Sequence, residues 1–279
     1  MREKAYAKLT LSLYAYKDKN ALKFKNVIVP IDLFDMVYLD KNETMEITTN
    51  KKFLPNDKRN TVYRALNFLK HKYKIKDNFK VHIVTNIPAQ SGMGGGSSNA
   101  AAVINMFDRM YDLNMTLEDK IDIAMRIDED TPFCIESKPA TVEGIGEIVN
   151  PINLNTELYY LVVKPRFGIS TKSFLRKFEA IDPEHENSME KMRDACESGS
   201  YEDILLNRYN SFQSTVEGRF DGMKKVMKRL DTLGLEGVGM TGSGSCIYGL
   251  SQDKEIVMQA FSKMSLKYPF VKYGRIHKE

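Results

Sequence analysis

A glycine-rich segment, PAQSGMGGGSSNAAA at residues 88–102, lies between a strand-like run and an alanine-rich helical run. Glycine lets backbone amides approach a ligand closely, and the first amides of a helix are unpaired and carry a partial positive charge. Such a segment is suited to bind phosphate. It fits neither the GxGxxG pattern nor the P-loop pattern, which needs a following lysine. A tight turn without a ligand is the alternative, but three consecutive glycines followed by two serines favour phosphate.

Phosphoryl transfer to a hydroxyl also needs an acceptor for the alcohol proton and a cation near the developing charge. Asp130 ends an acidic triplet that begins at Asp128, just before Pro132, and neighbouring carboxylates tend to raise a pKa toward that of a useful base. Lys8 lies on the polar face of an expected strand. A solvated acidic turn and a surface lysine are the plainer interpretations of these residues.

Composition limits the class of protein. The chain has 279 residues, 42% of them hydrophobic, which is enough for one large domain or two domains that share a cleft. Its 41 basic and 37 acidic residues are too balanced for a dedicated nucleic-acid binder, although a small anionic substrate fits. The basic run at 224–229 is typical of a solvated helix face. No apolar run reaches membrane-spanning length and the first residues are charged, so we expect a cytoplasmic protein.

Cysteine and histidine contribute no expected site. The three cysteines are odd in number and widely spaced, without a CxxC pair, which indicates buried or idle thiols instead of disulfides or a zinc site. The four histidines are scattered singly, without metal or triad spacing.

The elements that must position the candidate residues alternate between strands and helices. Alternating apolar and polar residues at 5–16 predict a half-buried strand that places Lys8 away from its apolar side. Thr116 and Asp119 are typical of a helix start. We expect further strands at 27–39, 45–50, 78–87, 158–165 and 244–250, and helices at 60–73, 99–113, 116–127, near 171–178 and within 200–233. The polar stretch at 181–200 is expected to form a loop and short helices. The pattern restarts after Pro151, which predicts domains at 1–152 and 153–279.

Several segments together resemble the GHMP kinases, the superfamily of galactokinase, homoserine kinase, mevalonate kinase and phosphomevalonate kinase. Within it they are most similar to the 4-diphosphocytidyl-2-C-methyl-D-erythritol kinases. The segments run in family order from residue 5 to about residue 250: AYAKLTLSL, IPAQSGMGGGSSNAA, DEDTPFCI, EGIGEIVNPI, KPRFGISTKSF and GMTGSGSCIYGL.

The resemblance implies a two-domain α+β GHMP kinase fold. Its N-terminal half, 1–152, would be ribosomal-protein-S5-like α/β and bind ATP. The C-terminal half, 153–279, would be ferredoxin-like α+β, with the active site in the cleft between the halves. The cofactors implied are ATP and Mg²⁺, and the partner is a small-molecule alcohol, with no nucleic acid or membrane. Monomer and homodimer both remain open.

The resemblance also implies roles for individual residues. Asp130 corresponds to the catalytic base and Lys8 to its electrostatic partner. Asn60 would lie on the adenine side, and Ser98 would contact Mg²⁺. The triphosphate would be held by Gly92, Gly94, Gly95, Gly96, Ser97 and Ser98, and the acceptor by Thr10, Thr171, Thr241, Gly242, Ser243 and Gly244. A simple hairpin is the alternative for the second glycine-rich segment.

The chain departs from the family where the acceptor is recognised. The family's Asp-Gly-Tyr-His motif grips cytosine, but Lys19, Asn20, Ala21 and Leu22 stand there. Ala and Leu can neither stack on a base nor hydrogen-bond its edge. Thr10 replaces the family's Asn, and Glu-Ser-Lys precedes EGIGE where a Gly is usual. Three hypotheses follow: a 4-diphosphocytidyl-2-C-methyl-D-erythritol kinase of non-mevalonate isoprenoid biosynthesis, a GHMP kinase with another acceptor, or a non-catalytic nucleotide-binding homologue. Retention of Lys8 and Asp130 argues against the last.

Overall fold

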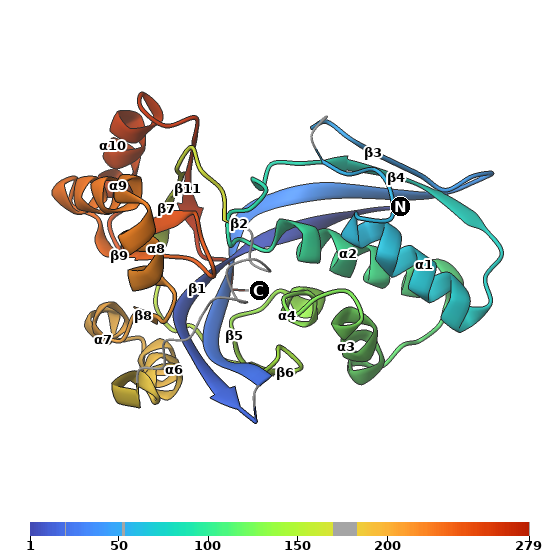
Figure 1. Cartoon of the computed structure of the whole chain (residues 1–279), viewed down its shortest axis with the longest axis horizontal. Helices are drawn as coiled ribbons and strands as arrows, with labels where there is room; N and C mark the ends of the chain where they lie inside the picture. Colours follow the sequence, from blue (N-terminus) through green and yellow to red (C-terminus); the bar gives the residue numbers. More distant parts are fainter. Residues whose placement is uncertain (20, 52–53, 170–182, 279) are drawn as a thin grey trace. The chain divides into compact units, whose positions relative to one another are not determined.

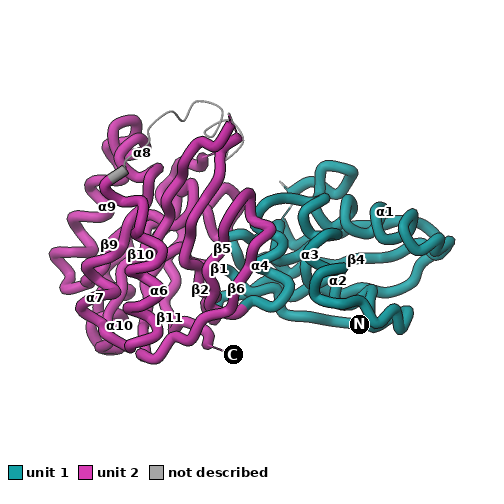
Figure 2. Tube along the Cα trace, turned by 90° about the horizontal axis from the view of Figure 1, so that it is seen from below, with its two compact units in different colours: residues 1–7, 33–87, 94–137 teal, residues 8–32, 88–93, 138–279 magenta. Residues whose placement is uncertain are grey.

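Strands β1 (Arg2–Asp18) and β2 (Ala21–Asn42) each contribute residues to two compact units (Figure 2). The computed structural model describes residues 1–19, 21–51, 54–169 and 183–278. Unit 1 comprises residues 1–7, 33–87 and 94–137, and unit 2 comprises residues 8–32, 88–93 and 138–279. The units are therefore built from interleaved chain segments. The division of the chain into domains at 1–152 and 153–279 stays a prediction.

Unit 1 places helices on one side of a small sheet (Figure 1). β2 pairs antiparallel with β4, with Met36 opposite Val84, and β3 pairs parallel with β4. The buried ring of Phe107 lies 5.6 Å from that of Phe79, which joins the helices to the sheet. The elements of this unit besides β1 and β2 are β3 (Glu46–Thr49), α1 (Thr61–Tyr73), β4 (Asn78–Val84), α2 (Gly95–Tyr111), α3 (Leu117–Met125) and α4 (Thr131–Glu136).

Unit 2 contains a four-stranded antiparallel sheet in the order β11-β7-β10-β9, against which α9 and α10 pack. Elsewhere in the unit, β5 pairs with β2 and β6, and β8 pairs with β1, placing Tyr209 opposite Ser12. The strands are β5 (Ala140–Gly144), β6 (Ile148–Pro151), β7 (Tyr159–Lys164), β8 (Tyr209–Asn210), β9 (Glu236–Met240), β10 (Ile247–Ser251) and β11 (Phe270–Arg275). The helices are η1 (Pro183–His185), α6 (Ser188–Ser198), α7 (Tyr201–Leu206), α8 (Gln213–Arg219), α9 (Asp221–Thr232) and α10 (Lys254–Ser265).

Helix starts agree well with the sequence, and helix lengths agree less well. Thr116 forms a reciprocal capping box with Asp119 at the start of α3, as predicted. Helix α1 begins at Thr61, one residue after the expected start, because Asn60 is its N-cap. Helix α2 begins at Gly95, four residues before the expected start, because the glycines that we assigned to a loop form its first turn. The expected 200–233 helical stretch is three helices interrupted by β8. The basic residues of α9 are largely exposed, as expected of a solvated face.

Strand β1 differs from the prediction of a half-buried strand. Its middle is buried on both faces, and Lys8 is only 3% exposed. A buried ammonium needs hydrogen-bonding partners, so this lysine is not the surface residue that a strand pattern alone would suggest.

The three cysteines are free and buried, as the sequence indicated. Burial raises the pKa of Cys196 and of Cys246 to about 12. No helix in the described part of the chain has the length and hydropathy needed to cross a bilayer.

Candidate active site

The N-terminus of α2 has the properties of a phosphate site. Gly94, at the N-cap, has φ 71° and offers no side-chain cap, and no acidic residue lies in the first turn. The first intrahelical bond runs from Ser98 N to Gly94 O at 2.8 Å. The preceding amides, including those of Gly95 and Gly96, have no acceptor within the helix, so the partial positive charge of the helix end is not neutralised by its own side chains. The donor set therefore fits an ATP phosphate.

Hydroxyl groups hold this first turn in place within unit 1. Ser98 Oγ contacts Tyr6 O at 2.6 Å and Gly94 O at 2.9 Å, and Thr61 Oγ1 donates to Gly96 O at 2.7 Å. The Ser98 proton is thus directed at backbone carbonyls, and only its oxygen lone pairs remain for a cation. The resemblance implied that Ser98 contacts Mg²⁺, and that role stays a prediction.

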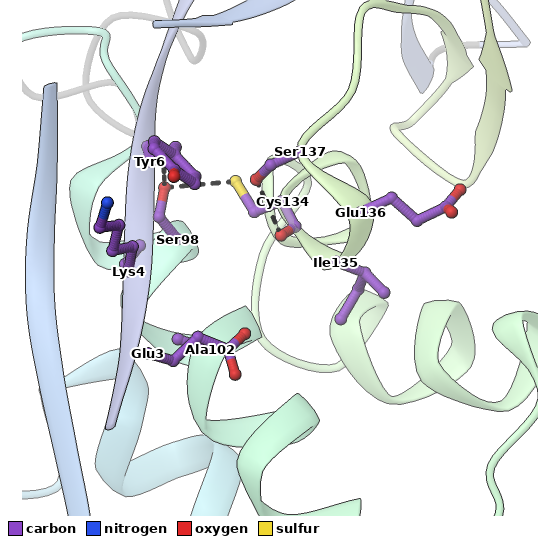
Figure 3. A pocket seen from close by; sticks show the side chains of 10 residues that line it. Glu3, Lys4, Tyr6, Ser98, Ala102, Cys134, Ile135, Glu136 and Ser137 are labelled. Carbon is purple, nitrogen blue, oxygen red and sulfur yellow. Dashed lines mark hydrogen bonds between the residues drawn. The ribbon is translucent and has the colours of Figure 1, made fainter. Parts of the chain in front are cut away.

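A pocket of about 330 Å³ lies behind Ser98 in unit 1 (Figure 3). The Cys134 thiol faces it, 3.5 Å from Ser98 Oγ. Sequence reasoning missed this pocket, because its wall joins the start of β1 to α2 and α4, which are far apart along the chain. The lining residues are Glu3, Lys4, Ala5, Tyr6, Ser98, Ala102, Cys134, Ile135, Glu136 and Ser137.

The second glycine-rich segment, residues 241–246, contacts the first glycine-rich segment, which we call the phosphate loop for its expected role. The contacts fall on residues 88–93, which belong to unit 2. Cys246 N donates to Ser91 O at 3.0 Å, and Thr241 Oγ1 donates to Gly92 O at 3.2 Å. A Cβ on Gly92, whose φ is +74°, would collide with the Thr241 carbonyl oxygen. The segment is therefore more than a simple hairpin: it braces the loop.

Lys8 and Thr10 join the same cluster in unit 2. Lys8 N donates to Met93 O at 3.1 Å, and Thr10 N donates to Thr241 Oγ1 at 3.1 Å. Lys8 Nζ donates to Thr10 Oγ1 at 3.0 Å. A Cβ on Gly242 would lie 3.0 Å from Lys8 Nζ. Five of the predicted site residues, including Gly92, are thus brought together by β1 and the two glycine-rich segments.

The acidic triplet lies in unit 1 at the start of α4. Asp130 occupies the N-cap position, where its side chain makes no cap hydrogen bond, and Pro132 follows in the first turn. Among the triplet, burial and then the charge of Asp130 raise the pKa of Asp128, and hydrogen bonds from Thr131 and Ser97 oppose that shift. The sequence drew attention to Asp130, and the structure adds Asp128, whose carboxylate accepts hydrogen bonds from Asp130 N and Thr131 N.

For the remaining predicted site residues, the structure gives contacts that do not by themselves indicate a role in binding. The Asn60 amide accepts from Val62 N at 2.9 Å and donates to Pro55 O at 2.7 Å, so both its ends hold the start of α1. Ser243 and Gly244 lie in the bracing segment, and Ser243 is 6% exposed. Thr171 lies outside the described residues.

The described side chains offer few ligands for a metal. Across the placed part of the chain, no group of three or more His, Cys, Asp or Glu side chains is arranged to hold an ion. A site with few protein ligands can still bind Mg²⁺, because this ion usually keeps several waters and binds through one or two protein groups and substrate phosphates.

Unit 1 thus offers a helix end suited to phosphate, and unit 2 offers a braced glycine loop with a buried lysine bonded to it. The model of the GHMP kinases N terminal domain matches residues 60–138, and that of the GHMP kinases C terminal domain matches residues 185–269. The chain belongs to the GHMP kinases and has their two-domain fold of mixed α and β structure. It is an ATP-dependent small-molecule kinase.

The relatives agree in name. The chain is 31% identical to 4-diphosphocytidyl-2-C-methyl-D-erythritol kinase of Clostridium botulinum, over 96% of this chain and 97% of that protein. It is 30% identical to the kinase of the same name from Thermoanaerobacter pseudethanolicus, over 99% and 96%.

Solved structures show the same fold. A crystal structure of 4-(cytidine 5'-diphospho)-2C-methyl-D-erythritol kinase matches with a TM-score of 0.81 at 23% identity, covering 100% of both chains. Homoserine kinase from Cytophaga hutchinsonii matches with a TM-score of 0.78 at 16% identity, covering 99% and 95%.

Proposed function

We propose that the chain transfers the γ-phosphoryl group of ATP to the hydroxyl of 4-diphosphocytidyl-2-C-methyl-D-erythritol, in non-mevalonate isoprenoid biosynthesis. The observation that supports it most is the chain of hydrogen bonds that runs from Lys8 to Thr10, from Thr10 to Thr241 and from Thr241 to Gly92 in the phosphate loop. The names of relatives about as long as this chain support the choice of acceptor.

Asp130 is proposed to take the proton of the acceptor hydroxyl, and Lys8 to stabilise the negative charge that develops during transfer. The amides at the start of α2 would hold the phosphates, and Ser98 Oγ would be the protein ligand of Mg²⁺. When bound with ATP, Mg²⁺ would neutralise phosphate charge. Lys8 belongs to unit 2 and Asp130 to unit 1, so this pairing rests on the family resemblance.

A GHMP kinase with a different acceptor is the second candidate. The turn between β1 and β2 carries no aromatic or His side chain from Lys17 to Lys23. Lys23 Nζ instead forms an ion pair of 2.5 Å with Asp18, and both groups are partly exposed. Such a turn offers charge where a base would need a stacking surface.

A coupled assay of ADP release distinguishes the candidates. Purified protein with ATP and Mg²⁺ is given 4-diphosphocytidyl-2-C-methyl-D-erythritol, the same alcohol without its cytidine diphosphate, homoserine or mevalonate in parallel. Turnover of about 1–100 s⁻¹ with the first compound supports the proposal. Comparable turnover only with another alcohol supports the second candidate, and ATP binding without turnover of any of them supports a non-catalytic homologue.

A further inference from the structure

Asp128, the first residue of the acidic triplet, accepts several hydrogen bonds at once. Its Oδ1 accepts from Thr131 Oγ1 at 2.7 Å, from Thr131 N at 2.9 Å and from Asp130 N at 3.2 Å. These bonds join the Asp128 side chain to the backbone at the start of α4.

The turn that holds Asp130 is anchored from a second side. Arg64 of α1 donates through Nη2 to Ile127 O at 2.6 Å and to Arg126 O at 3.2 Å. Arg64 holds the residues before Asp128, and the Asp128 carboxylate holds those after it. Thr61, also on α1, donates to Gly96 O in the first turn of α2 at 2.7 Å, so α1 links the segment 126–131 to that turn, and all of these residues lie in unit 1.

The arrangement has an electrostatic cost that argues for a role. Desolvation and the nearby Asp130 charge both disfavour ionised Asp128, and the hydrogen bonds from Thr131 and Ser97 are what stabilise it. Asn at this place would avoid the repulsion and keep one accepting oxygen. Two close carboxylates are maintained although a neutral side chain could make much of the same contact.

We infer that Asp128 is a positioning residue, which fixes the Asp130 backbone at the start of α4, in the turn that Arg64 holds to α1. The expected effect on turnover rests on the proposed role of Asp130, whereas the tether, meaning the hydrogen bonds of the Asp128 carboxylate, does not depend on that role. Loss of the tether would let Asp130 move relative to the phosphate loop, and misplacement of about 1 Å can reduce turnover about a hundredfold.

The test compares Asp128→Ala with Glu129→Ala, the exposed neighbour in the same triplet. Hydrogen exchange followed by mass spectrometry reports on the tether without any substrate. We expect peptides covering 127–136 to exchange about tenfold faster in Asp128→Ala, and to be unchanged in Glu129→Ala. Unchanged exchange in both variants would overturn the inference.

Kinetics then test the consequence. With the acceptor that the wild-type protein turns over, Asp128→Ala should lower kcat about 10–100-fold with a much smaller change in KM for ATP, and Asp128→Asn should restore most of kcat. If Asp128→Ala does not fold, Thr131→Val, which removes only the hydroxyl donor, should show a smaller kcat loss in the same direction. Full kcat in Asp128→Ala or Thr131→Val overturns the positioning role. If Asp128→Ala exchanges faster but the wild-type protein turns over none of the alcohols, the hydrogen bonds of Asp128 are supported and the proposed function is rejected.

Discussion

The ammonium group of Lys8 donates a hydrogen bond of 3.0 Å to the hydroxyl of Thr10, two residues along the same buried strand. Thr10 in turn donates its backbone amide to Thr241, so the lysine is oriented by a residue that is itself held by the bracing segment. An oriented, desolvated cation stabilises developing charge more effectively than a mobile one.

Separate replacements of Lys8 and Thr10 should distinguish how much the lysine charge and its orientation each contribute to kcat. Lys8→Met keeps a long side chain and removes the cation, and we expect kcat to fall at least about a hundredfold. Thr10→Val keeps the shape and removes the hydroxyl, with an expected loss of about tenfold. Initial rates at saturating ATP measure both. Retention of more than half of the wild-type kcat in Lys8→Met would remove the lysine from the proposed role.

Gly92 should tolerate no side chain. Because its φ is +74° and a Cβ would meet the Thr241 carbonyl, Gly92→Ala should lower the free energy of unfolding by about 1–3 kcal/mol. Urea unfolding followed by circular dichroism gives the value. The matched control is Gly218→Ala on the exposed face of α8, where a Cβ meets nothing within 4 Å, and a gain of about 0.5–1 kcal/mol is expected. Equal effects of the two substitutions would contradict the bracing contact.

The sequence predicted most local structure, since helix caps and alternating strands depend on neighbours in the chain. The start of α1 near residue 60 and the Thr116 capping box are cases of this kind. Burial of Lys8 could not be predicted in the same way, because a polar residue on a strand is read as solvated unless its distant partners are known. The prediction of a half-buried β1 was wrong for this reason.

Asp35 should make stability depend on pH. Its side chain is 1% exposed, accepts from Asn86 N at 2.7 Å and Ile87 N at 2.8 Å, and burial raises its pKa above the ordinary 3.8. Below pH 3.8 the group is protonated in both states. As pH rises from there through the raised pKa, the unfolded chain loses the proton first, so the contribution of Asp35 to stability falls.

The comparison variant is Asp35→Asn, which cannot ionise. Its oxygen can accept from the same two amides. The Oδ1 atom of Asn99 is buried and has no hydrogen-bond partner among the described residues, so after a flip it could accept from the new amide. We expect the wild-type protein to lose free energy of unfolding relative to this variant between about pH 4 and pH 7 in urea titrations. A difference that is constant with pH would show that the Asp35 pKa is not raised.

The three thiols should differ in reactivity. At neutral pH, Cys196 and Cys246 are almost wholly protonated because burial raises the pKa of each to about 12, whereas Cys134 lines a pocket. Native protein treated with a small maleimide should therefore be modified at Cys134 first, and at the other two only after denaturation. Peptide mass spectrometry locates the labels. Early labelling of Cys246 would contradict its burial.

The candidate site was predictable in parts. The glycine and serine types at 92–98 indicated phosphate, because the chemistry of a helix N-terminus is local. Contact between Gly92 and Thr241 was not predictable from spacing, since about 150 residues separate them and only the fold brings the carbonyl to the glycine. Asp128 was noticed only as a neighbour of Asp130, because the contacts of its carboxylate depend on how the chain turns into α4.

The most direct test of the proposed phosphoryl transfer is identification of its product. Wild-type protein and Asp130→Asn are incubated with ATP, Mg²⁺ and 4-diphosphocytidyl-2-C-methyl-D-erythritol, and the alcohol is analysed by mass spectrometry while ADP is quantified. The proposal predicts a singly phosphorylated alcohol in amounts equal to ADP for the wild type, and almost none for Asp130→Asn, which should still bind ATP. No phosphorylated alcohol from the wild type, or equal amounts from both proteins, would contradict it.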